Sequence, residues 1–243
     1  MYLHRPNGPH TCFTVYGSPC TPKKWNWAFQ YEAEEASQLW DTIPPDADIV
    51  ITHTPPKGHC DTATKDDRSG CEALVEALRR IRPMLSVFGH IHEARGVQRV
   101  RWKTDSLETG QLTEAVEAWK DPGEGNNKQS LVNLTANGGR PLGNRSRLTR
   151  QMHIPEDFLD MGGDRGSGGI PQGLSSEAGN EVDRRETVMI NAAFLGARMA
   201  GKAKKFNKPI VVDVDLPVWR ESEAQSDGDG GPRTLCIQST PPT

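Results

Sequence analysis

The sequence predicts an α/β fold, and three observations carry that prediction. Two short apolar runs at residues 48–52 and 84–88 have the composition of strands buried on both faces. Between them, residues 71–81 repeat apolar side chains at helical spacing and end just before a proline. A strand, a helix and a strand in this order form a βαβ unit with a right-handed crossover, whose two strands lie parallel in one sheet.

The chain ahead of this unit predicts one strand and one helix. Residues 11–19 have strand character that breaks at a Gly-Ser-Pro sequence, and residues 32–40 have helical character that ends before two prolines. An aromatic cluster, Trp25, Trp27 and Phe29, lies between them. We interpret this cluster as core or lid packing in preference to a ligand-stacking platform.

Beyond residue 103 the predicted elements become sparse. A helix is possible over 112–119, and three strand candidates follow at 131–137, 187–191 and 209–215. Residues 138–185 are rich in Gly, Arg, Ser and Asp without periodicity, which predicts a long disordered insertion. A disordered tail is expected over 218–243. The expected organisation is therefore one domain over 11–217 that contains this insertion.

Composition excludes several classes of partner. The formal net charge of −3 is too near neutral to favour a nucleic acid or an anionic membrane as a partner. No apolar run is long enough to span a bilayer, and the first residues lack the apolar core of a signal peptide. The five cysteines are scattered without C-x-x-C spacing, so we expect reduced thiols and a cytoplasmic or nuclear location.

Histidines follow both strands of the βαβ unit. His53 comes directly after the first strand, and His90 and His92 follow the second behind Gly89. Open α/β sheets place their ligands at the carboxyl ends of parallel strands, and residues two apart in an extended segment point to one side. Gly89 is expected to permit the tight turn out of the strand. We therefore predict that the three imidazoles bind divalent metal, although histidines alone do not select among Mn, Fe, Zn, Ni and Cu.

The sequence around these histidines resembles a known family. The run VFGHIHEARG at 87–96 and the run ITHTPPKGHCD at 51–61 resemble the last two metal-binding motifs of calcineurin-like metallophosphoesterases. Further segments are similar to small metallophosphoesterase-domain proteins related to class III cyclic-nucleotide phosphodiesterases: VYGSP, WAF, GCEAL, INAAF and PIVVDVDLP. The resemblance covers 13–102 and returns over 131–141 and 187–217.

This resemblance implies a four-layer α/β/β/α sandwich with a binuclear metal site at its edge. In the family, the histidine of T-H-x-P-P and the first histidine of G-H-x-H bind one metal, which correspond to His53 and His90. The second histidine of G-H-x-H, here His92, binds the other metal. Such a pair of ions would clamp a phosphoester and activate a water for in-line attack on phosphorus.

The family's earlier motifs, D-x-H, G-D and G-N-H-D/E, do not occur in these 243 residues. We therefore expect a partial sandwich that lacks its N-terminal half, and a two-metal site without the carboxylates that would balance its charge. Three neutral imidazoles do not offset two divalent cations, so at most weak binding of a single metal is expected.

Three other residues near the motifs are weaker candidates. Asp61 lies inside the matched motif and could act in catalysis or hold a ligand in place, His59 could contact a phosphate, and Arg95 could meet a phosphate as a forked donor. A surface ion pair is an equal possibility for Arg95.

The sequence therefore supports a metal-dependent phosphoesterase that hydrolyses phosphomonoesters or phosphodiesters and is impaired or inactive as this chain. The alternative is a non-catalytic remnant that acts as a binding or scaffold protein.

Overall fold

The computed structural model describes residues 2–3, 11–24, 26–64, 67–103, 113–144, 184–196 and 205–216. Apart from Leu3 and Thr11, these residues belong to one compact unit. Most of the predicted insertion, residues 145–183, and all of the predicted tail over 218–243 lie outside the described residues. The expectations of disorder there stay predictions.

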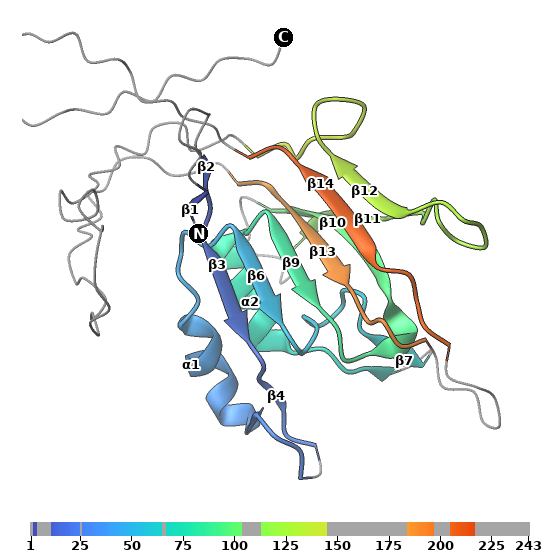
Figure 1. The fold of residues 1–243 in the computed structure, drawn as a ribbon. Coiled ribbons are helices and arrows are strands. Elements are labelled where there is room, and N and C mark those ends of the chain that lie inside the picture. The colour runs from blue at the N-terminus through green and yellow to red at the C-terminus, as the bar shows by residue number, and fades with distance from the viewer. Residues whose placement is uncertain are drawn as a thin grey trace, which may run out of the picture. The chain divides into compact units, whose positions relative to one another are not determined.

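A mixed sheet of six strands forms the centre of this unit, in the order β11-β10-β13-β9-β6-β3 (Figure 1). Strands β3, β6, β9 and β13 run parallel to one another, and β10 runs antiparallel to both β13 and β11. The strand bounds are β3 (Val15–Ser18), β6 (Ile49–Thr52), β9 (Leu85–Phe88), β10 (Gly96–Trp102), β11 (Thr113–Ala118) and β13 (Glu186–Asn191).

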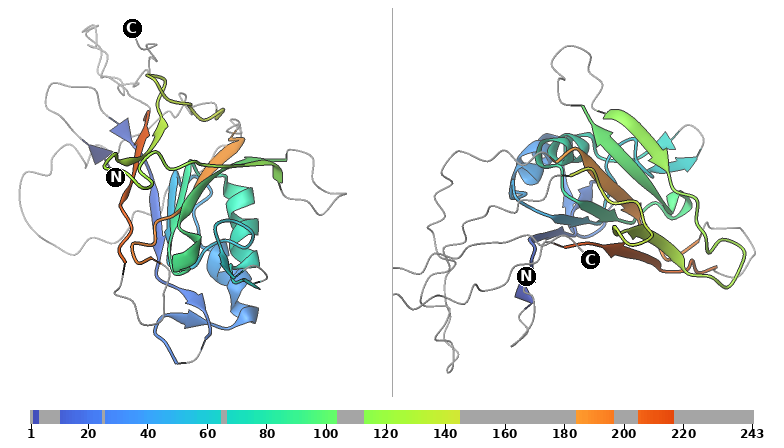
Figure 2. Two further views of the ribbon diagram at one scale, coloured as in Figure 1. Left: turned by 90° about the vertical axis from the view of Figure 1, so that its right-hand side faces the viewer. Right: turned by 90° about the horizontal axis from the view of Figure 1, so that it is seen from above.

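Helices cover one face of this sheet. A short 3-10 turn, η1 (Ala33–Glu35), leads into α1 (Ala36–Asp41), and α2 (Glu72–Ile81) connects β6 to β9 (Figure 2). Trp40 and Leu78 are fully buried in a cluster that includes Val50 and Met189 of the sheet. The predicted βαβ order and the parallel pairing of its strands are therefore confirmed.

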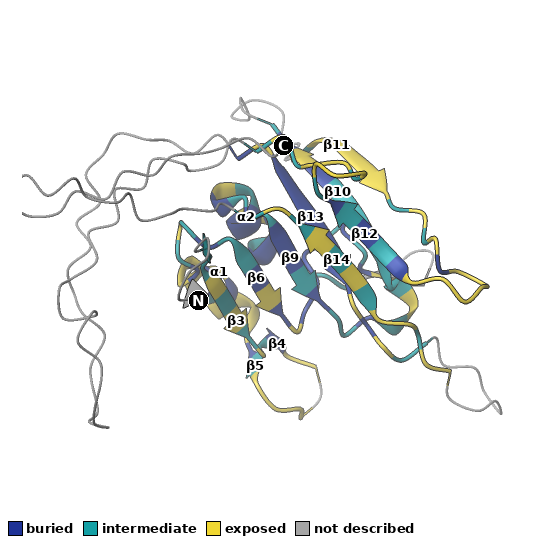
Figure 3. Ribbon diagram, turned by 45° about the horizontal axis from the view of Figure 1, so that its top comes forward, coloured by how far each residue is buried: buried dark blue, intermediate teal, exposed yellow. Residues whose placement is uncertain are grey.

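Two further strands pack on the opposite face. β12 (Ser130–Leu134) and β14 (Ile210–Val214) pair in parallel and lie across the sheet from the helices (Figure 2). Their inward residues Val132 and Leu134 are buried in a second cluster with Val97, Val188 and Ile190 of the main sheet. The alternating colours of β14 in Figure 3 follow the period of two expected for a strand with one buried face. The strand predictions at 131–137, 187–191 and 209–215 are confirmed.

The described residues thus form a helical layer, a six-stranded sheet and a two-stranded layer. This confirms a mixed α/β fold, while the complete four-layer sandwich stays a prediction. In the part of the chain that the structure describes, no helix has the length and apolar character to cross a bilayer. The predicted cytoplasmic or nuclear location is not tested by this finding.

The predicted helix at 112–119 is wrong, because residues 113–118 form β11. Val116 pairs with Val100 of β10, and the four β11 residues 115–118 keep one antiparallel register before it shifts between Arg101 and Trp102. The open edge of β10 offers a row of backbone partners, which outweigh a weak local preference for helix. β10 itself was not predicted, since arginines at 99 and 101 interrupt its apolar residues.

The remaining elements are short and lie in connecting segments. They are β1 (Tyr2–Leu3), β2 (Thr11–Cys12), β4 (Thr21–Pro22), β5 (Gln30–Tyr31), β7 (Thr62–Thr64), β8 (Asp67–Arg68) and the 3-10 turn η2 (His92–Ala94).

Candidate functional site

The ends of β6 and β9 bring two of the three predicted histidines together. The strands are paired as far as Ile51 and Val87, and beyond them the Gly89 amide donates to the carbonyl of His53 over 3.3 Å. The two loops therefore leave the sheet side by side. Nδ1 of His90 lies 3.0 Å from Nε2 of His53, and the ring centroids are 4.8 Å apart.

His90 occupies the centre of an unusually tight turn. The amide of Ile91 donates to the carbonyl of Gly89 over 2.7 Å, and the φ of His90 is +66°. A hydrogen bond between residues i and i+2 across a residue with positive φ is the classic γ-turn, which is rare and strained. The demand that we expected Gly89 to meet therefore falls on His90, because Gly89 is not among the residues with positive φ.

The surroundings of His90 favour its neutral form. Burial is the largest influence that lowers the pKa of His90, and the positive charges of His53, Lys24 and His92 lower it further. A neutral imidazole keeps a lone pair on one ring nitrogen. At neutral pH, His90 is therefore able either to accept a proton from His53 or to ligate a metal ion.

The spacing of these two nitrogens is compatible with one metal ion. Two imidazole nitrogens on a single tetrahedral zinc lie about 3.3 Å apart, given metal–nitrogen distances of about 2.0–2.1 Å. The observed 3.0 Å is close to that value, and it is also the length of an ordinary hydrogen bond. A small movement of either ring would convert the shared proton into a shared ion.

A second metal is a poor fit to the residues that the structure describes. Among them, no group of three or more His, Cys, Asp or Glu side chains is arranged to hold an ion. His92 begins η2 and is close enough for its charge to affect the pKa of His90, but it does not complete such a group. The described side chains therefore supply two converging imidazoles and no carboxylate to a single candidate centre.

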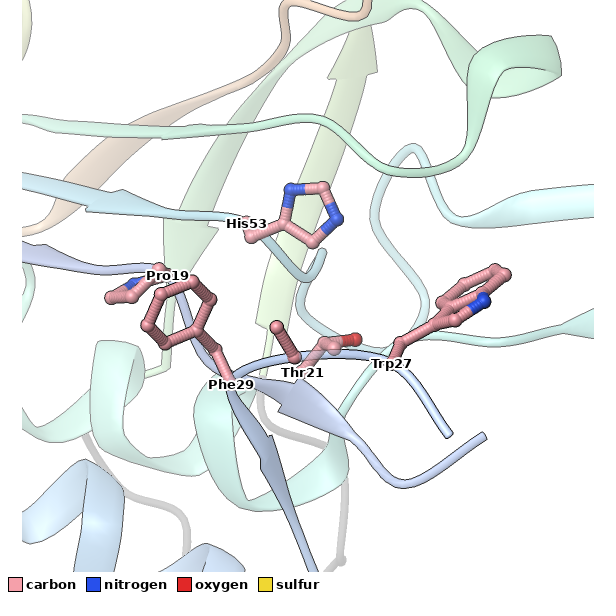
Figure 4. Close-up of a pocket in the computed structure, with 6 residues that line it drawn as sticks. Pro19, Thr21, Trp27, Phe29 and His53 are labelled. Atoms are coloured by element: carbon pink, nitrogen blue, oxygen red, sulfur yellow. The ribbon is translucent and has the colours of Figure 1, made fainter. Parts of the chain in front are cut away.

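An apolar hollow adjoins the histidine pair. It has a volume of about 240 Å³ and is lined by Pro19, Thr21, Trp27, Ala28, Phe29 and His53. Figure 4 shows Trp27 and Phe29 on opposite sides of Thr21, with the His53 ring nearby. The rings of Trp27 and His90 are also arranged edge to face, with an interplanar angle of 82° and centroids 6.1 Å apart.

Core packing, one of the two kinds expected for these aromatic residues, is wrong for Trp27 and Phe29, while packing as a lid stays a prediction. Trp27 is 51% exposed and Phe29 is 67% exposed, and Phe29 has a φ of +54°. A bulky residue in the left-handed region is a backbone outlier that persists only where its surroundings enforce it. The β4–β5 pairing does so, because the Thr21 amide donates to the Phe29 carbonyl over 3.0 Å. Trp25 lies outside the described residues.

Asp61 organises the loop that follows His53. Its Oδ2 accepts hydrogen bonds from the amides of Gly58 at 2.9 Å and Gly70 at 3.1 Å, and the residue is 1% exposed. At Gly70 the chain passes so close to Pro56 and Lys57 that an added Cβ would lie 2.7 Å from their backbone atoms. Asp61 thus has a structural task in this structure, and a catalytic role for it stays a prediction.

His59 and Arg95 also have partners within the protein. His59 is buried, with Nδ1 3.1 Å from the side-chain oxygen of Gln98. Arg95 forms a largely buried ion pair with Asp121 at 3.0 Å and donates to the carbonyl of Lys208 at 2.8 Å. Arg95 thus forms an ion pair, but a largely buried one and not the surface pair that we considered, and phosphate binding by either residue stays a prediction.

Sequence analysis missed one residue that touches both histidine loops. Asn191, the last residue of β13, is fully buried. Its side-chain amide donates to the carbonyls of Cys60 and Ile91, each over 2.9 Å, and its oxygen accepts from the amide of Ala193. The run INAAF was noted only as part of the resemblance. Its signal was a polar residue at the end of an otherwise apolar strand.

Together these features describe an α/β protein with paired imidazoles at the carboxyl edge of its parallel strands, where such folds hold ligands. Comparison with known proteins adds a family resemblance. UPF0046 protein T07D4.2 of Caenorhabditis elegans is 44% identical over 85 residues, 34% of this chain and 22% of that protein. Human metallophosphoesterase domain-containing protein 1 is 44% identical over 88 residues, 35% of this chain and 27% of that protein. These relatives support a resemblance to the metallophosphoesterases.

A third relative carries a different name. Probable rhamnogalacturonate lyase C of Emericella nidulans is 46% identical over 90 residues, which make up 36% of this chain and 8% of that protein. The chain thus spans between 8% and 27% of the lengths of these three curated relatives. No protein-family model matches the sequence.

Proposed function

We propose that this chain forms part of a metal-dependent phosphoesterase, acting on phosphomonoesters or phosphodiesters, and that its own activity is impaired. One observation carries the proposal: the facing ring nitrogens of His53 and His90, 3.0 Å apart at the ends of adjacent parallel strands. The relatives named for a metallophosphoesterase domain support it. The finer likeness to class III cyclic-nucleotide phosphodiesterases belongs to the same proposal.

His53 and His90 would hold one divalent ion, with Mn, Fe and Zn as candidates. When bound, such an ion supplies a Lewis acid for a phosphoryl oxygen and lowers the pKa of a water molecule. The lowered pKa of His90 keeps its imidazole neutral at physiological pH, as a ligand must be. In this proposal, His92 serves a second ion whose remaining ligands are not among the described residues.

The hollow beside His53 would receive the organic group of the ester. Trp27 and Phe29 present exposed rings there, and the Trp27 ring lies in an edge-to-face arrangement with the ring of His90. A flat apolar group that lies between these rings would leave its phosphoryl group near the imidazoles. None of the described residues that line the hollow carries a fixed charge, so it would recognise shape and apolar area rather than a particular head group.

Metal-dependent hydrolysis tests this proposal. Purified protein is incubated with Mn²⁺ or Zn²⁺ and bis(4-nitrophenyl) phosphate, alongside the variants His53→Ala and His90→Ala. We expect slow hydrolysis that requires the added ion and disappears in both variants. Hydrolysis that continues in a chelator, or that survives both substitutions, would disprove the assignment.

A non-catalytic binding or scaffold role is the second candidate. It is favoured by the lack of a carboxylate beside the histidine pair among the described residues, since two neutral imidazoles do not balance a divalent charge. In that case the protein would bind an ion weakly and hydrolyse nothing. Metal uptake without hydrolysis in the experiment above would support this candidate.

A further inference from the structure

Asn191 holds the loops of both histidines from beneath. It ends β13, the neighbour of β9 in the sheet, and it is fully buried. Its amide nitrogen donates to Cys60, in the loop that follows His53, and to Ile91, between His90 and His92. Its side-chain oxygen accepts a hydrogen bond from the amide of Ala193. Both the nitrogen and the oxygen of the side chain are therefore engaged.

The bond to Ile91 acts on the strained turn directly. Ile91 donates its amide to Gly89 across the turn and offers its carbonyl to Asn191. Both backbone polar groups of Ile91 are therefore fixed, and Ile91 directly follows His90, the residue whose φ is +66°. Cys60, which also has a positive φ of +46°, is the second residue that Asn191 bonds. Strained conformations persist only where surrounding contacts enforce them.

We infer that Asn191 is a positioning residue for the candidate site, which keeps His90 in the tight turn and aims its ring at His53. This inference rests on the proposed function, because the position of His90 matters for catalysis only if His53 and His90 bind the metal. Without the amide donors, two buried carbonyls would lose their partners and the turn would relax toward ordinary backbone angles. The His90 ring would then swing away from His53.

Asn207 offers a matched control. Its side-chain amide also bridges two carbonyls, those of Ala193 and Leu195, at 2.9 and 3.1 Å. These carbonyls belong to the segment after β13 and not to either histidine loop. Asn207→Ala therefore removes the same chemistry, while the bonds of Asn191 to Cys60 and Ile91 remain in place.

The experiment compares Asn191→Ala, Asn191→Asp and Asn207→Ala with the wild-type protein. Asn191→Asp keeps an oxygen for Ala193 and removes the donating NH₂ group, so it separates the two tasks. Two quantities are measured on each folded protein: the nuclear Overhauser effect between the rings of His53 and His90, and the affinity for Zn²⁺. Denaturant unfolding reports stability separately.

We expect both Asn191 variants to lose the ring-to-ring Overhauser effect and to bind Zn²⁺ at least about tenfold more weakly, as changes outside a metal's own ligands commonly do. Asn207→Ala should keep both signals, whatever its stability. A folded Asn191 variant that retains the ring contact would overturn the inference. If neither variant folds, the wild-type side-chain amide protons decide, since rapid exchange with solvent would contradict their bonds to Cys60 and Ile91.

Failure of the proposed function would look different. In that case the wild-type protein would neither bind Zn²⁺ nor hydrolyse the ester, while the ring-to-ring Overhauser effect would still depend on Asn191. The ring contact alone would then decide the role of Asn191.

Discussion

His90 shows how a single residue can carry both strain and function. Its φ of +66° is a conformation that costs an L-amino acid about 1–2 kcal/mol, and glycine would adopt it without that cost. The neighbouring Gly89 does not use this freedom, and an added Cβ there would meet nothing within 4 Å. The histidine at position 90 therefore occurs together with a strained backbone conformation.

This strain makes a prediction about stability. Substituting His90 by Gly and by Ala removes the same ring, but only Gly relieves the backbone. We expect the free energy of unfolding of His90→Gly, measured by urea denaturation, to exceed that of His90→Ala by about 1 kcal/mol. At position 89 the order should reverse, with Gly89→Ala no less stable than the wild-type protein. Equal stabilities for the two His90 variants would argue against the tight turn.

Trp27 provides a second test at the level of a residue. Because its side chain is half exposed, Trp27→Ala should change the free energy of unfolding by less than about 1 kcal/mol. The same change should weaken the binding of phenyl phosphate several-fold and leave methyl phosphate unaffected, since only the former has a ring to place in the hollow. Titrations followed by nuclear magnetic resonance measure both. An equal loss of affinity for the two esters would show that the apolar hollow does not bind the organic group.

At the scale of elements, a buried carboxylate joins the far end of β13 to β10. Glu186 accepts hydrogen bonds from Arg99 at 2.6 Å, from Arg101 at 3.2 Å and from the amide of Gly143 at 2.5 Å. Burial on its own would raise the pKa of Glu186, but these donors and the positive charge of Arg99 lower it to about 2. In its ionised form Glu186 thus links the start of β13 to Arg99 and Arg101 of β10 and to the amide of Gly143.

The sign of the pH dependence follows from this lowered pKa. An unfolded Glu186 titrates near 4.5, so its contribution to stability is complete above that pH and is lost as the pH falls toward about 2. The loss is on the order of 3 kcal/mol, at about 1.4 kcal/mol per pKa unit. Urea denaturation between pH 6 and pH 2 measures it. Glu186→Gln should be less stable at pH 6 and should show a flatter profile; a parallel profile would place the acid sensitivity elsewhere.

The pattern of apolar residues predicted the three elements of the βαβ unit. The structure has β6, α2 and β9 within residues 48–52, 71–81 and 84–88, because burial of their regularly spaced apolar side chains in the core favours these elements. β10 and β11 escaped prediction because their pairing depends on a partner across the sheet. The charged side chains of Arg99 and Arg101 interrupt the apolar pattern of β10. Both form ion pairs with Glu186 of β13.

The same reasoning explains what could be predicted of the site. That His53 and His90 approach each other followed from their positions at two adjacent strand ends. The γ-turn at His90 and the bonds of Asn191 could not be predicted, because both depend on which carbonyls lie within reach in the folded chain. The exposure of Trp27 and Phe29 could not be predicted either, since an aromatic pair at this spacing is typical of a core.

At the scale of the whole molecule, the main sheet is unevenly covered. Ile49 and Val87 pack against the β12–β14 layer, but Val15 and Ile51 of the same sheet are 42% and 45% exposed. These two side chains belong to adjacent strands and share one face, because residues two apart point the same way. An apolar patch of this kind favours association with another surface.

We therefore predict concentration-dependent association of the purified protein. Ile51→Lys should shift the sedimentation coefficient toward that of a monomer, because it places a charge in the exposed patch. Val211→Lys, at a similarly exposed position on β14, serves as the control and should leave association unchanged. A wild-type protein that sediments as a monomer at all concentrations would contradict this prediction.

The central claim is that the facing nitrogens of His53 and His90 serve one divalent ion. A double-mutant cycle of Zn²⁺ binding by calorimetry tests it most directly, with His53→Ala, His90→Ala and the double variant. Each single substitution should abolish nearly as much binding free energy as both together, because one remaining imidazole holds an ion poorly. Losses that simply add, or Zn²⁺ binding that survives in the double variant, would show that the two rings do not share an ion.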